Sequence, residues 1–370
     1  MKLKNFFKFF FFSKFQFFTP KKKFVVFDFV NLRFLYKYIN KNDIEVVYIR
    51  GEKINIYILI KTLFSGFSSK KYFENYINCI EPEFCITFAD NSRIFYELEL
   101  KKKIKKISIQ NTWRNPLDDT ILNIEKESNK KLYCDYLFAF NEEIGKKYLD
   151  IIDSKVIPIG SFKSNYSLKK KDKNFKYDLL FISSYNDKNK QINYLDMNIA
   201  TFHKNQPDLL KAINSYATKN DKKLFVYGKK EEPSEIINEE EYFRDYLTNK
   251  FTYLKNDRLN SLEIIDNANI IITINSTLGY EALSNGKKVI FFDILPKVGK
   301  AKYTKFGWPY DYGSEGLFWT NKFDENSVLN IINKVEKLSF SEWTEKVAQI
   351  SNSLMKKDSD NSKFNRIIGN

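Results

Sequence analysis

The sequence predicts an α/β protein built from two doubly wound parallel sheets, and three observations support this fold class. The chain has 370 residues, which is enough for two domains of ordinary size. Short apolar stretches rich in β-branched and aromatic residues alternate with segments of helical character. Several of these stretches show no polar alternation, as expected of strands that are buried on both faces of a parallel sheet.

The expected elements form an N-terminal and a C-terminal α/β domain with a further segment at each end. In the first domain we expect strands over residues 24–29, 44–48, 84–88, 106–109 and 133–140, and helices from Asn31 and over 55–64, 72–80 and 95–102. In the second we expect strands over 177–182, 223–226, 251–253, 270–274 and 289–292, and helices over 208–218, 261–265 and 277–284 and from Ser327 and Ser341. The predicted domain ranges are 1–18, 19–160, 161–340 and 341–370, with a solvated linker at 167–176 and an exposed acidic run at 231–241.

The stretch from Ile270 to Asp293 predicts a strand, a polar turn, a short helix and a second strand. Ser276 suits the N-cap of the helix. Backbone N–H groups, two hydroxyls and the positive end of a helix meet at such a turn, which favours a phosphate or diphosphate. We expect Gly279 to leave room for the ligand and Glu281 to accept hydrogen bonds from ribose hydroxyls. The structural alternative is that Ser276 only caps the helix and that Glu281 is a solvated surface residue.

The net charge of +15 and the pI of about 9.3 allow a nucleic-acid-binding function. However, arginine accounts for only seven of the 61 basic residues, and no stretch interleaves arginine with aromatic residues. An anionic membrane surface or an anionic sugar donor explains the charge at least as well. We therefore expect no nucleic-acid partner.

The three cysteines and the single histidine limit the chemistry that the chain can perform. Cys79, Cys85 and Cys134 form no Cys-x-x-Cys pair, which indicates a reducing compartment such as the cytoplasm. With His203 alone, a zinc cluster of His and Cys ligands is excluded. The Asp-x-Asp pattern at residues 358–360 lies in what we expect to be a polar, disordered tail. We therefore expect no essential metal and no cofactor.

Residues 1–18 form a segment rich in phenylalanine and lysine, with nine Phe between Phe6 and Phe18. The segment is too short and too charged for a bilayer span of about 20 apolar residues, and no signal-peptide cleavage site follows it. It either lies in the membrane interface at the inner face of the cytoplasmic membrane or packs on the domain as a strand or helix. Both alternatives stay open.

The turn and helix after residue 274 resemble the nucleotide-sugar site of GT-B glycosyltransferases, above all the bacterial enzymes that build capsule, O-antigen and other surface polysaccharides. The matching residues are Ser276, Thr277, Leu278, Gly279, Glu281, Ala282, Leu283, Gly286 and Lys287. The resemblance implies two Rossmann-like domains that face a cleft, with the donor bound by the C-terminal domain. It also implies that the segment 157–162 joins the two domains.

The resemblance assigns roles to polar residues at the predicted strand ends, where ligands bind in open α/β sheets. The expected donor-binding residues are Ser183, Ser184, Tyr185, Gly228, Lys229, Asn275, Ser276, Thr277, Gly279 and Glu281. The expected acceptor-side residues are Arg50, Asn91, Gln110 and Asn111. The catalytic candidates are Asp90, Asp28 and His203.

Asp90 is the first catalytic candidate because a carboxylate there would act as a general base or as the nucleophile of a retaining mechanism. The structural alternative is an Asx turn that caps the next helix, and Asp28 has the same two interpretations. His203 would contact donor phosphate or carboxylate, or it is a structural or surface histidine. Lys229 is a possible phosphate partner.

The implied function is transfer of a sugar from a nucleotide-sugar donor to a glycan or lipid-linked glycan acceptor. CMP-linked acidic sugars such as Kdo are the expected donors, because the site is rich in lysine and related enzymes use them. Three alternatives stay open: a CDP-glycerol-type glycerophosphotransferase, a nucleotide-sugar 2-epimerase, and a non-catalytic basic module that binds membrane or nucleic acid.

Overall fold

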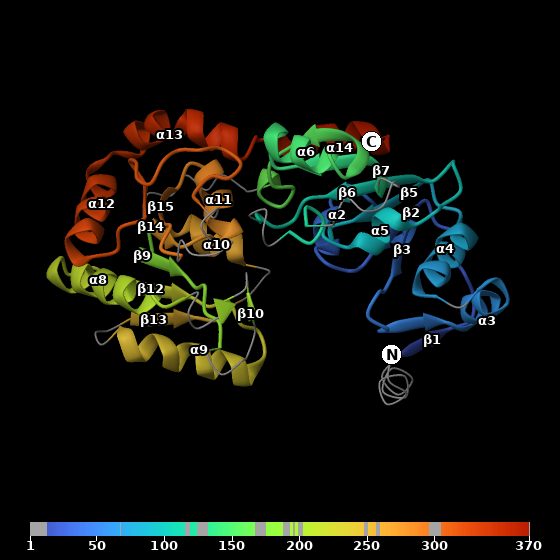
Figure 1. Cartoon of the computed structure of the whole chain (residues 1–370), viewed down its shortest axis with the longest axis horizontal. Helices are drawn as coiled ribbons and strands as arrows, with labels where there is room; N and C mark the ends of the chain where they lie inside the picture. The colour runs from blue at the N-terminus through green and yellow to red at the C-terminus, as the bar shows by residue number, and fades with distance from the viewer. Residues whose placement is uncertain are drawn as a thin grey trace. The chain divides into compact units, whose positions relative to one another are not determined.

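In a computed structural model the chain forms two compact units, each built around a six-stranded sheet (Figure 1). Unit 1 comprises residues 1–111, 119–166 and 358–370, and unit 2 comprises residues 112–118 and 167–357. The structure describes residues 13–66, 68–114, 119–123, 132–166, 175–187, 193–194, 197–198, 203–247, 251–256, 260–295 and 305–369. The units differ from the predicted domain ranges, because residues 112–118 group with unit 2 and residues 161–166 and 358–370 with unit 1. The predicted end segments are not separate units: residues 1–18 group with unit 1 and residues 341–357 with unit 2.

The sheet of unit 1 is parallel throughout and has the strand order β3-β2-β5-β6-β7-β8. Its strands are β2 (Phe24–Phe27), β3 (Ile44–Val47), β5 (Phe84–Thr87), β6 (Lys105–Ile109), β7 (Leu132–Ala139) and β8 (Ile152–Pro158). The helices are α2 (Leu32–Leu35), α3 (Ile56–Ser65), α4 (Ser69–Ile80), α5 (Arg93–Glu97), α6 (Glu142–Leu149) and α14 (Ser362–Ile368). A separate pair joins β1 (Lys14–Gln16) to β4 (Lys53–Asn55) in parallel. The chain leaves β2 toward β3 and later continues on the other side of β2 with β5, so the strand order reverses between β2 and β5.

Helix α5 and strand β8 of unit 1 differ from the sequence prediction. The helix expected over 95–102 ends at Glu97, because the ammonium group of Lys106 binds the carbonyl oxygens of Tyr96 and Leu98 at 2.9 and 3.0 Å at the helix end. Strand β8 was not predicted, and its last residue is Pro158. Proline lacks a backbone N–H, so it is tolerated at the end of an edge strand.

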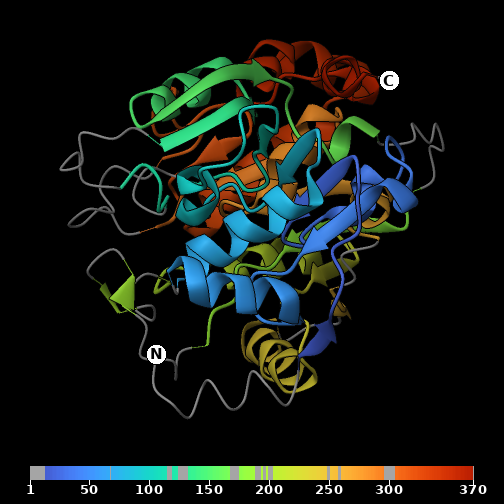
Figure 2. The same cartoon turned by 90° about the vertical axis from the view of Figure 1, so that its right-hand side faces the viewer.

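The C-terminal segment is ordered in the structure, and the prediction of a disordered polar tail was wrong. Residues 359–361 form a 3-10 helix that leads into α14. Phe364 and Ile368 of α14 are buried in the core of unit 1, and the rings of Phe364 and Phe162 lie 5.0 Å apart. Figures 1 and 2 both show the red C-terminal helix against the green elements of unit 1. The hydrophobic burial of two side chains outweighs the polar composition of the segment.

The sheet of unit 2 is also parallel, with the order β13-β12-β9-β14-β15-β16. Its strands are β9 (Tyr177–Ile182), β12 (Leu224–Tyr227), β13 (Phe251–Leu254), β14 (Ala268–Thr273), β15 (Lys288–Phe292) and β16 (Trp319–Thr320). The helices are α8 (Gln206–Lys219), α9 (Pro233–Tyr246), α10 (Ser261–Asp266), α11 (Thr277–Ser284), α12 (Glu325–Lys337) and α13 (Phe340–Leu354), and β10 (Asn193–Tyr194) pairs with β11 (Met197–Asn198). The strand order reverses between β9 and β14, as in dinucleotide-binding sheets.

Two six-stranded parallel sheets with helices confirm the predicted α/β class. In the described parts of the chain, no helix has both the length and the hydropathy needed to cross a bilayer. Of the predicted N-terminal segment, residues 1–12 lie outside the described residues, as do residues 167–174 of the predicted linker. Residues 14–16 form strand β1, so this part of the segment packs on unit 1 as a strand.

Candidate functional site

Polar turns follow three neighbouring strands of the unit 2 sheet. Residues 183–185 follow β9, Gly228 and Lys229 follow β12, and residues 275–277 follow β14. Because these strands are parallel and adjacent in the sheet, the three turns lie along one edge of it. The reversal of strand order between β9 and β14 is where ligands bind in such sheets. The structure thus brings the predicted donor-binding turns together at the switch point of unit 2.

The N-terminus of α11 is held by a set of short-range hydrogen bonds. Ser276 is the N-cap, and its hydroxyl accepts the N–H of Leu278 at 3.2 Å. The hydroxyl of Thr277 accepts the N–H of Trp113 at 2.8 Å, and the Trp113 ring stacks on Tyr280 of α11 at 4.1 Å. Both hydroxyls act here as acceptors, so each can still offer its own proton to an anion. The stretch 112–118, which belongs to unit 2 although it lies far earlier in the sequence, therefore helps to build this turn. The sequence did not indicate this contact.

Gly279 and Glu281 of α11 are both buried. A Cβ atom on Gly279 would lie 2.6 Å from Cγ2 of Thr273 and 3.2 Å from Cε1 of Phe291. The space at Gly279 is therefore occupied by the sheet, and the glycine serves close helix–sheet packing and not the approach of a ligand. The side chain of Glu281 is 2% exposed, so the alternative of a solvated surface residue is wrong. Its ribose-binding role stays a prediction.

The switch-point edge also carries a chain of three polar side chains. The ammonium group of Lys229 donates to Asn186 Oδ1 at 3.1 Å, and Asn186 Nδ2 lies 2.8 Å from Nε2 of His203. Desolvation and the charge of Lys229 lower the pKa of His203 to about 4, so its imidazole is neutral at pH 7. Desolvation and the charge of Lys230 lower the pKa of Lys229. The edge therefore offers one cationic donor beside a neutral histidine.

The buried carboxylate of Glu239 on α9 forms hydrogen bonds with the turn after β9 and with the turn after β12. Its oxygens accept the backbone N–H groups of Lys229 and Lys230 at distances from 2.8 to 3.1 Å, the hydroxyl of Tyr253 at 2.9 Å, and the hydroxyl of Ser183. Its side chain is fully buried, which corrects the predicted exposure of the acidic run 231–241. Sequence alone could not predict this role, because Glu239 lies within an acidic helix and belongs to no motif.

The catalytic candidate Asp28 stands at the switch point of unit 1, directly after β2. It has a positive φ of 71° and is 1% exposed. One carboxylate oxygen accepts from Arg50 at 2.9 Å and the other accepts the N–H of Phe29 at 2.7 Å. Burial raises the pKa of Asp28, and the guanidinium of Arg50 opposes this shift. The structure thus joins one predicted catalytic residue to one predicted acceptor-side residue.

The remaining predicted residues of unit 1 follow β5, which pairs with β2, and β6, which pairs with β5. Asp90 is 3% exposed, and its backbone carbonyl accepts from the Tyr96 hydroxyl at 2.8 Å. The carbonyl of Asn91 accepts from Thr120 at 3.0 Å. The side-chain oxygen of Gln110 accepts the N–H of Phe140 at 2.9 Å, which ties the ends of β6 and β7 together. Asn111 accepts from Asn31.

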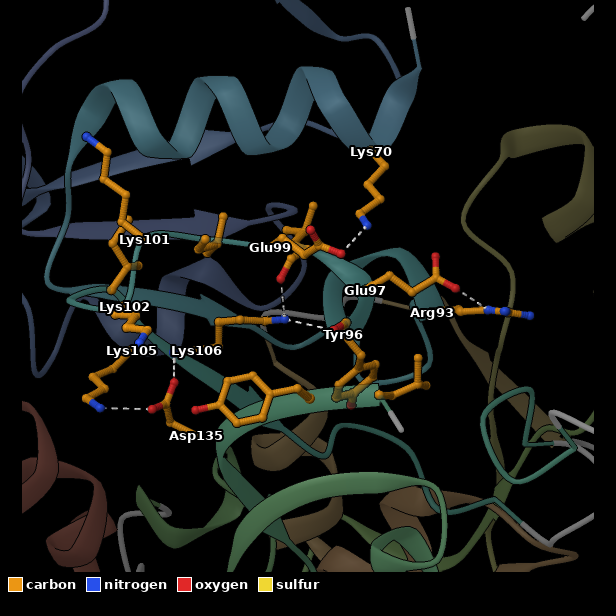
Figure 3. A pocket seen from close by; sticks show the side chains of 15 residues that line it. Lys70, Arg93, Tyr96, Glu97, Glu99, Lys101, Lys102, Lys105, Lys106 and Asp135 are labelled. Atoms are coloured by element: carbon orange, nitrogen blue, oxygen red, sulfur yellow. Dashed lines mark hydrogen bonds and ion pairs between the residues drawn. The ribbon is translucent and has the colours of Figure 1, made fainter. Parts of the chain in front are cut away.

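A hollow of about 700 Å³ lies at the opposite edge of the unit 1 sheet, by the first residues of β6 and β7 (Figure 3). Three of its basic side chains are ion-paired: Lys70 pairs with Glu99 at 3.2 Å, Arg93 with Glu97 at 2.6 Å, and Lys105 with Asp135 at 3.0 Å. Burial lowers the pKa of Lys106 to about 8, and its ammonium group caps α5. None of the predicted site residues lines this hollow, so it is not the predicted site.

Comparisons with known proteins identify a matching family and solved structures with a similar fold. Residues 107–370 match the model of a family described as "putative O-antigen biosynthesis protein". No curated protein matches the sequence. Among solved structures, the wall teichoic acid polymerase TagF is similar with 12% identity over 95% of this chain and 89% of that chain, at a TM-score of 0.54.

Two further structures share the fold. UDP-GlcNAc 2-epimerase from Neisseria meningitidis, bound to UDP-GlcNAc, is similar with 14% identity over 94% of this chain and 99% of that chain, at a TM-score of 0.52. MnaA from S. aureus, in a structure with UDP, is similar with 13% identity over 94% and 95% of the chains, at a TM-score of 0.50. The chain therefore belongs to this family of O-antigen biosynthesis proteins, and it has a GT-B-like fold.

Proposed function

We propose that this protein is a glycosyltransferase that moves a sugar from a nucleotide-sugar donor to a surface-glycan acceptor. The observation that carries the proposal is the switch-point edge of unit 2, where the N-terminus of α11, two hydroxyls and Lys229 lie on adjacent strand ends. The positive end of a helix and a cation suit a diphosphate or a phosphate ester. The family match to O-antigen biosynthesis supports a surface-glycan acceptor. The neighbours bound to UDP-GlcNAc and UDP support a nucleotide-sugar ligand.

Within this proposal the leaving nucleotide is stabilised by the N–H groups of α11 and by Lys229, without a metal. Glu281 accepts hydrogen bonds from the ribose. Asp90 is the general base for the acceptor hydroxyl or the nucleophile, and Asp28 is the next candidate. His203 is neutral at pH 7, so it orients Asn186 and is not a cation for the phosphate. A CMP-linked acidic sugar is the proposed donor, and the reaction takes place at the cytoplasmic face of the membrane.

Product analysis by mass spectrometry tests this function. The full chain is incubated with CMP-, UDP-, GDP- and dTDP-sugars and with CDP-glycerol, in the presence of lipid-linked glycan acceptor. A new glycosidic linkage is the expected product. A phosphodiester would indicate glycerophosphotransfer, a changed free donor would indicate an epimerase, and no product with any donor would indicate a binding module; each of these contradicts the proposal.

The substitution Asp90→Asn tests the catalytic assignment in the same assay. It keeps the shape of the side chain and removes its charge, so turnover should fall by about 100-fold or more while donor affinity stays nearly unchanged. Asp43→Asn, at an exposed position of unit 1, is the matched control. Both variants should melt at the temperature of the unchanged chain, so that a loss of turnover reflects lost catalysis and not lost folding. Near-normal turnover of Asp90→Asn would move the assignment to Asp28.

A further inference from the structure

An unusual number of apolar side chains are exposed on one part of unit 1. Helix α3 buries Ile58 and Thr62 toward α4, and its other side carries Tyr57, Ile60, Leu63 and Phe64 with exposures of 52, 51, 58 and 89%. These four positions fall on one arc of the helix, because neighbouring residues on a helix surface are three and four apart. A stable soluble surface rarely shows so many large apolar groups together.

The segment after β1 extends this apolar face. Phe17 and Phe18 are 63 and 85% exposed. The carbonyl of Phe18 accepts from the side chain of Asn55, the N-cap of α3, at 3.0 Å. The strand β1 contacts α3, as Figure 1 also shows. We call the set Phe17, Phe18, Tyr57, Ile60, Leu63 and Phe64 the apolar face.

A lysine cluster lies beside the apolar face, around the end of α4. It consists of Lys21, Lys61, Lys101 and Lys103. Lys61 of α3 lies 3.2 Å from Sγ of Cys79, and Lys21 donates to the carbonyl of the same cysteine at 3.1 Å. Lys21, Lys101 and Lys103 surround the carboxylate of Glu81 at 2.9, 2.6 and 3.9 Å. Three ammonium groups thus share one carboxylate, and the hydrogen bonds from Lys101 and Lys21 lower the pKa of Glu81 to about 2. Residues 13–23 and 56–65 contain no acidic residue.

We propose that the apolar face and the adjoining lysine cluster form a docking surface for an anionic lipid bilayer. The aromatic and aliphatic side chains enter the headgroup region, and the lysines stay at its level against the lipid phosphates. The net positive charge beside the apolar face favours anionic lipid over a second copy of this basic chain. Docking through α3 needs no nucleotide, so it does not depend on the proposed transfer reaction.

Co-flotation of the full chain with vesicles tests the docking surface. The chain should float with vesicles of phosphatidylcholine mixed with phosphatidylglycerol, and less with phosphatidylcholine alone. Ile60→Ser and Phe64→Ser should each weaken the partition by about ten-fold. The matched control is Ile237→Ser on α9 of unit 2, where the side chain is similarly exposed at 57%, and it should bind like the unchanged chain.

Charge variants complete the test. Lys21→Gln combined with Lys61→Gln should weaken binding by about five-fold per lysine at low salt, and Lys211→Gln on α8 should have little effect. Melting temperatures equal to that of the unchanged chain verify the fold. The proposal is overturned if the α3 variants float like Ile237→Ser, or if they change only the sedimentation coefficient, which would assign the face to contact between copies.

Discussion

Glu239 accepts hydrogen bonds from four groups of unit 2, although it is not one of the predicted site residues. Its carboxylate satisfies two backbone N–H groups of the turn after β12 and the hydroxyls of Ser183 and Tyr253. A buried acceptor of this kind fixes the positions of Lys229 and of the turn after β9. The geometry of the switch-point edge therefore depends on a residue that need not touch the ligand.

Glu239→Gln should lower the free energy of unfolding by about 2 kcal/mol. The amide keeps the shape of the side chain but turns one acceptor into a donor, which then faces N–H and O–H groups that lose their partner. Urea unfolding followed by circular dichroism measures the change. Glu241→Gln, on the same helix and exposed, should change the free energy of unfolding by less than about 0.5 kcal/mol. Equal effects of the two variants would show that the hydrogen bonds of Glu239 do not stabilise the turns.

His203 should make the protein less stable as the pH falls. Its folded pKa is lowered to about 4, whereas an unfolded histidine has a pKa of about 6.5. Between these values the unfolded chain binds one proton more than the folded chain. The stability that the neutral histidine contributes is therefore present above about pH 6.5 and is lost as the pH falls toward about pH 4.

The comparison of the unchanged chain with His203→Gln isolates this contribution. From about pH 7.5 to about pH 5.5, the free energy of unfolding should fall by about 1.4 kcal/mol less in the variant. Urea unfolding at both pH values gives the difference. Identical losses in the two proteins would mean that His203 titrates normally in the folded state.

Among the elements, helix α11 has an N-terminus suited to an anionic ligand, and the rest of the helix packs closely on the sheet. Gly279 lets the helix approach β14 and β15, and Ser276 caps the helix at the turn. The sequence predicted this strand–turn–helix unit because its pattern is local: a buried strand, an N-cap residue and a terminating Asn-Gly. The packing role of Gly279 could not be predicted, because it depends on Thr273 and Phe291, whose positions against the helix follow only from the folded sheet.

Gly279→Ala should lower the free energy of unfolding by about 2 kcal/mol, because the new methyl group would lie 2.6 Å from Cγ2 of Thr273. Thr273→Ser removes that methyl group and keeps the hydroxyl that accepts the N–H of Ser276. The double variant should therefore be more stable than the sum of the two single effects implies. If urea unfolding gave additive changes in the free energy of unfolding, residues 279 and 273 would not be in contact.

Helix α5 and the segment 358–369 differ from the sequence prediction for the same reason, contact with residues distant in the sequence. α5 stops early because Lys106, nine residues after its end, binds its last carbonyl groups. The segment 358–369 is ordered because Phe364 packs in a core whose other members, apart from Ile368, lie within residues 24–162. Composition and periodicity describe a segment alone, and both outcomes were decided by distant partners.

At the scale of the whole molecule, the alternation of strands and helices was sufficient to predict two parallel sheets. It was not sufficient to predict that the chain enters unit 2, with residues 112–118, before it completes unit 1, or that it returns to unit 1 with α14. The strand ends were predicted well enough to place the site residues on the two switch-point edges. Their hydrogen-bond partners Asn186 and Glu239 could not be predicted, because neither belongs to a motif.

A thermal-shift panel of CMP, UDP, GDP and dTDP tests whether the switch-point edge of unit 2 binds a nucleotide. A ligand that binds only the folded state raises the melting temperature. We expect at least one nucleotide to do so, and Lys229→Ala to weaken its binding by about ten-fold through the loss of one charged hydrogen bond. Lys223→Ala removes the same charge at the opposite end of β12 and should leave the binding unchanged. No shift with any nucleotide, or equal weakening by the two lysine variants, would contradict nucleotide binding at this edge.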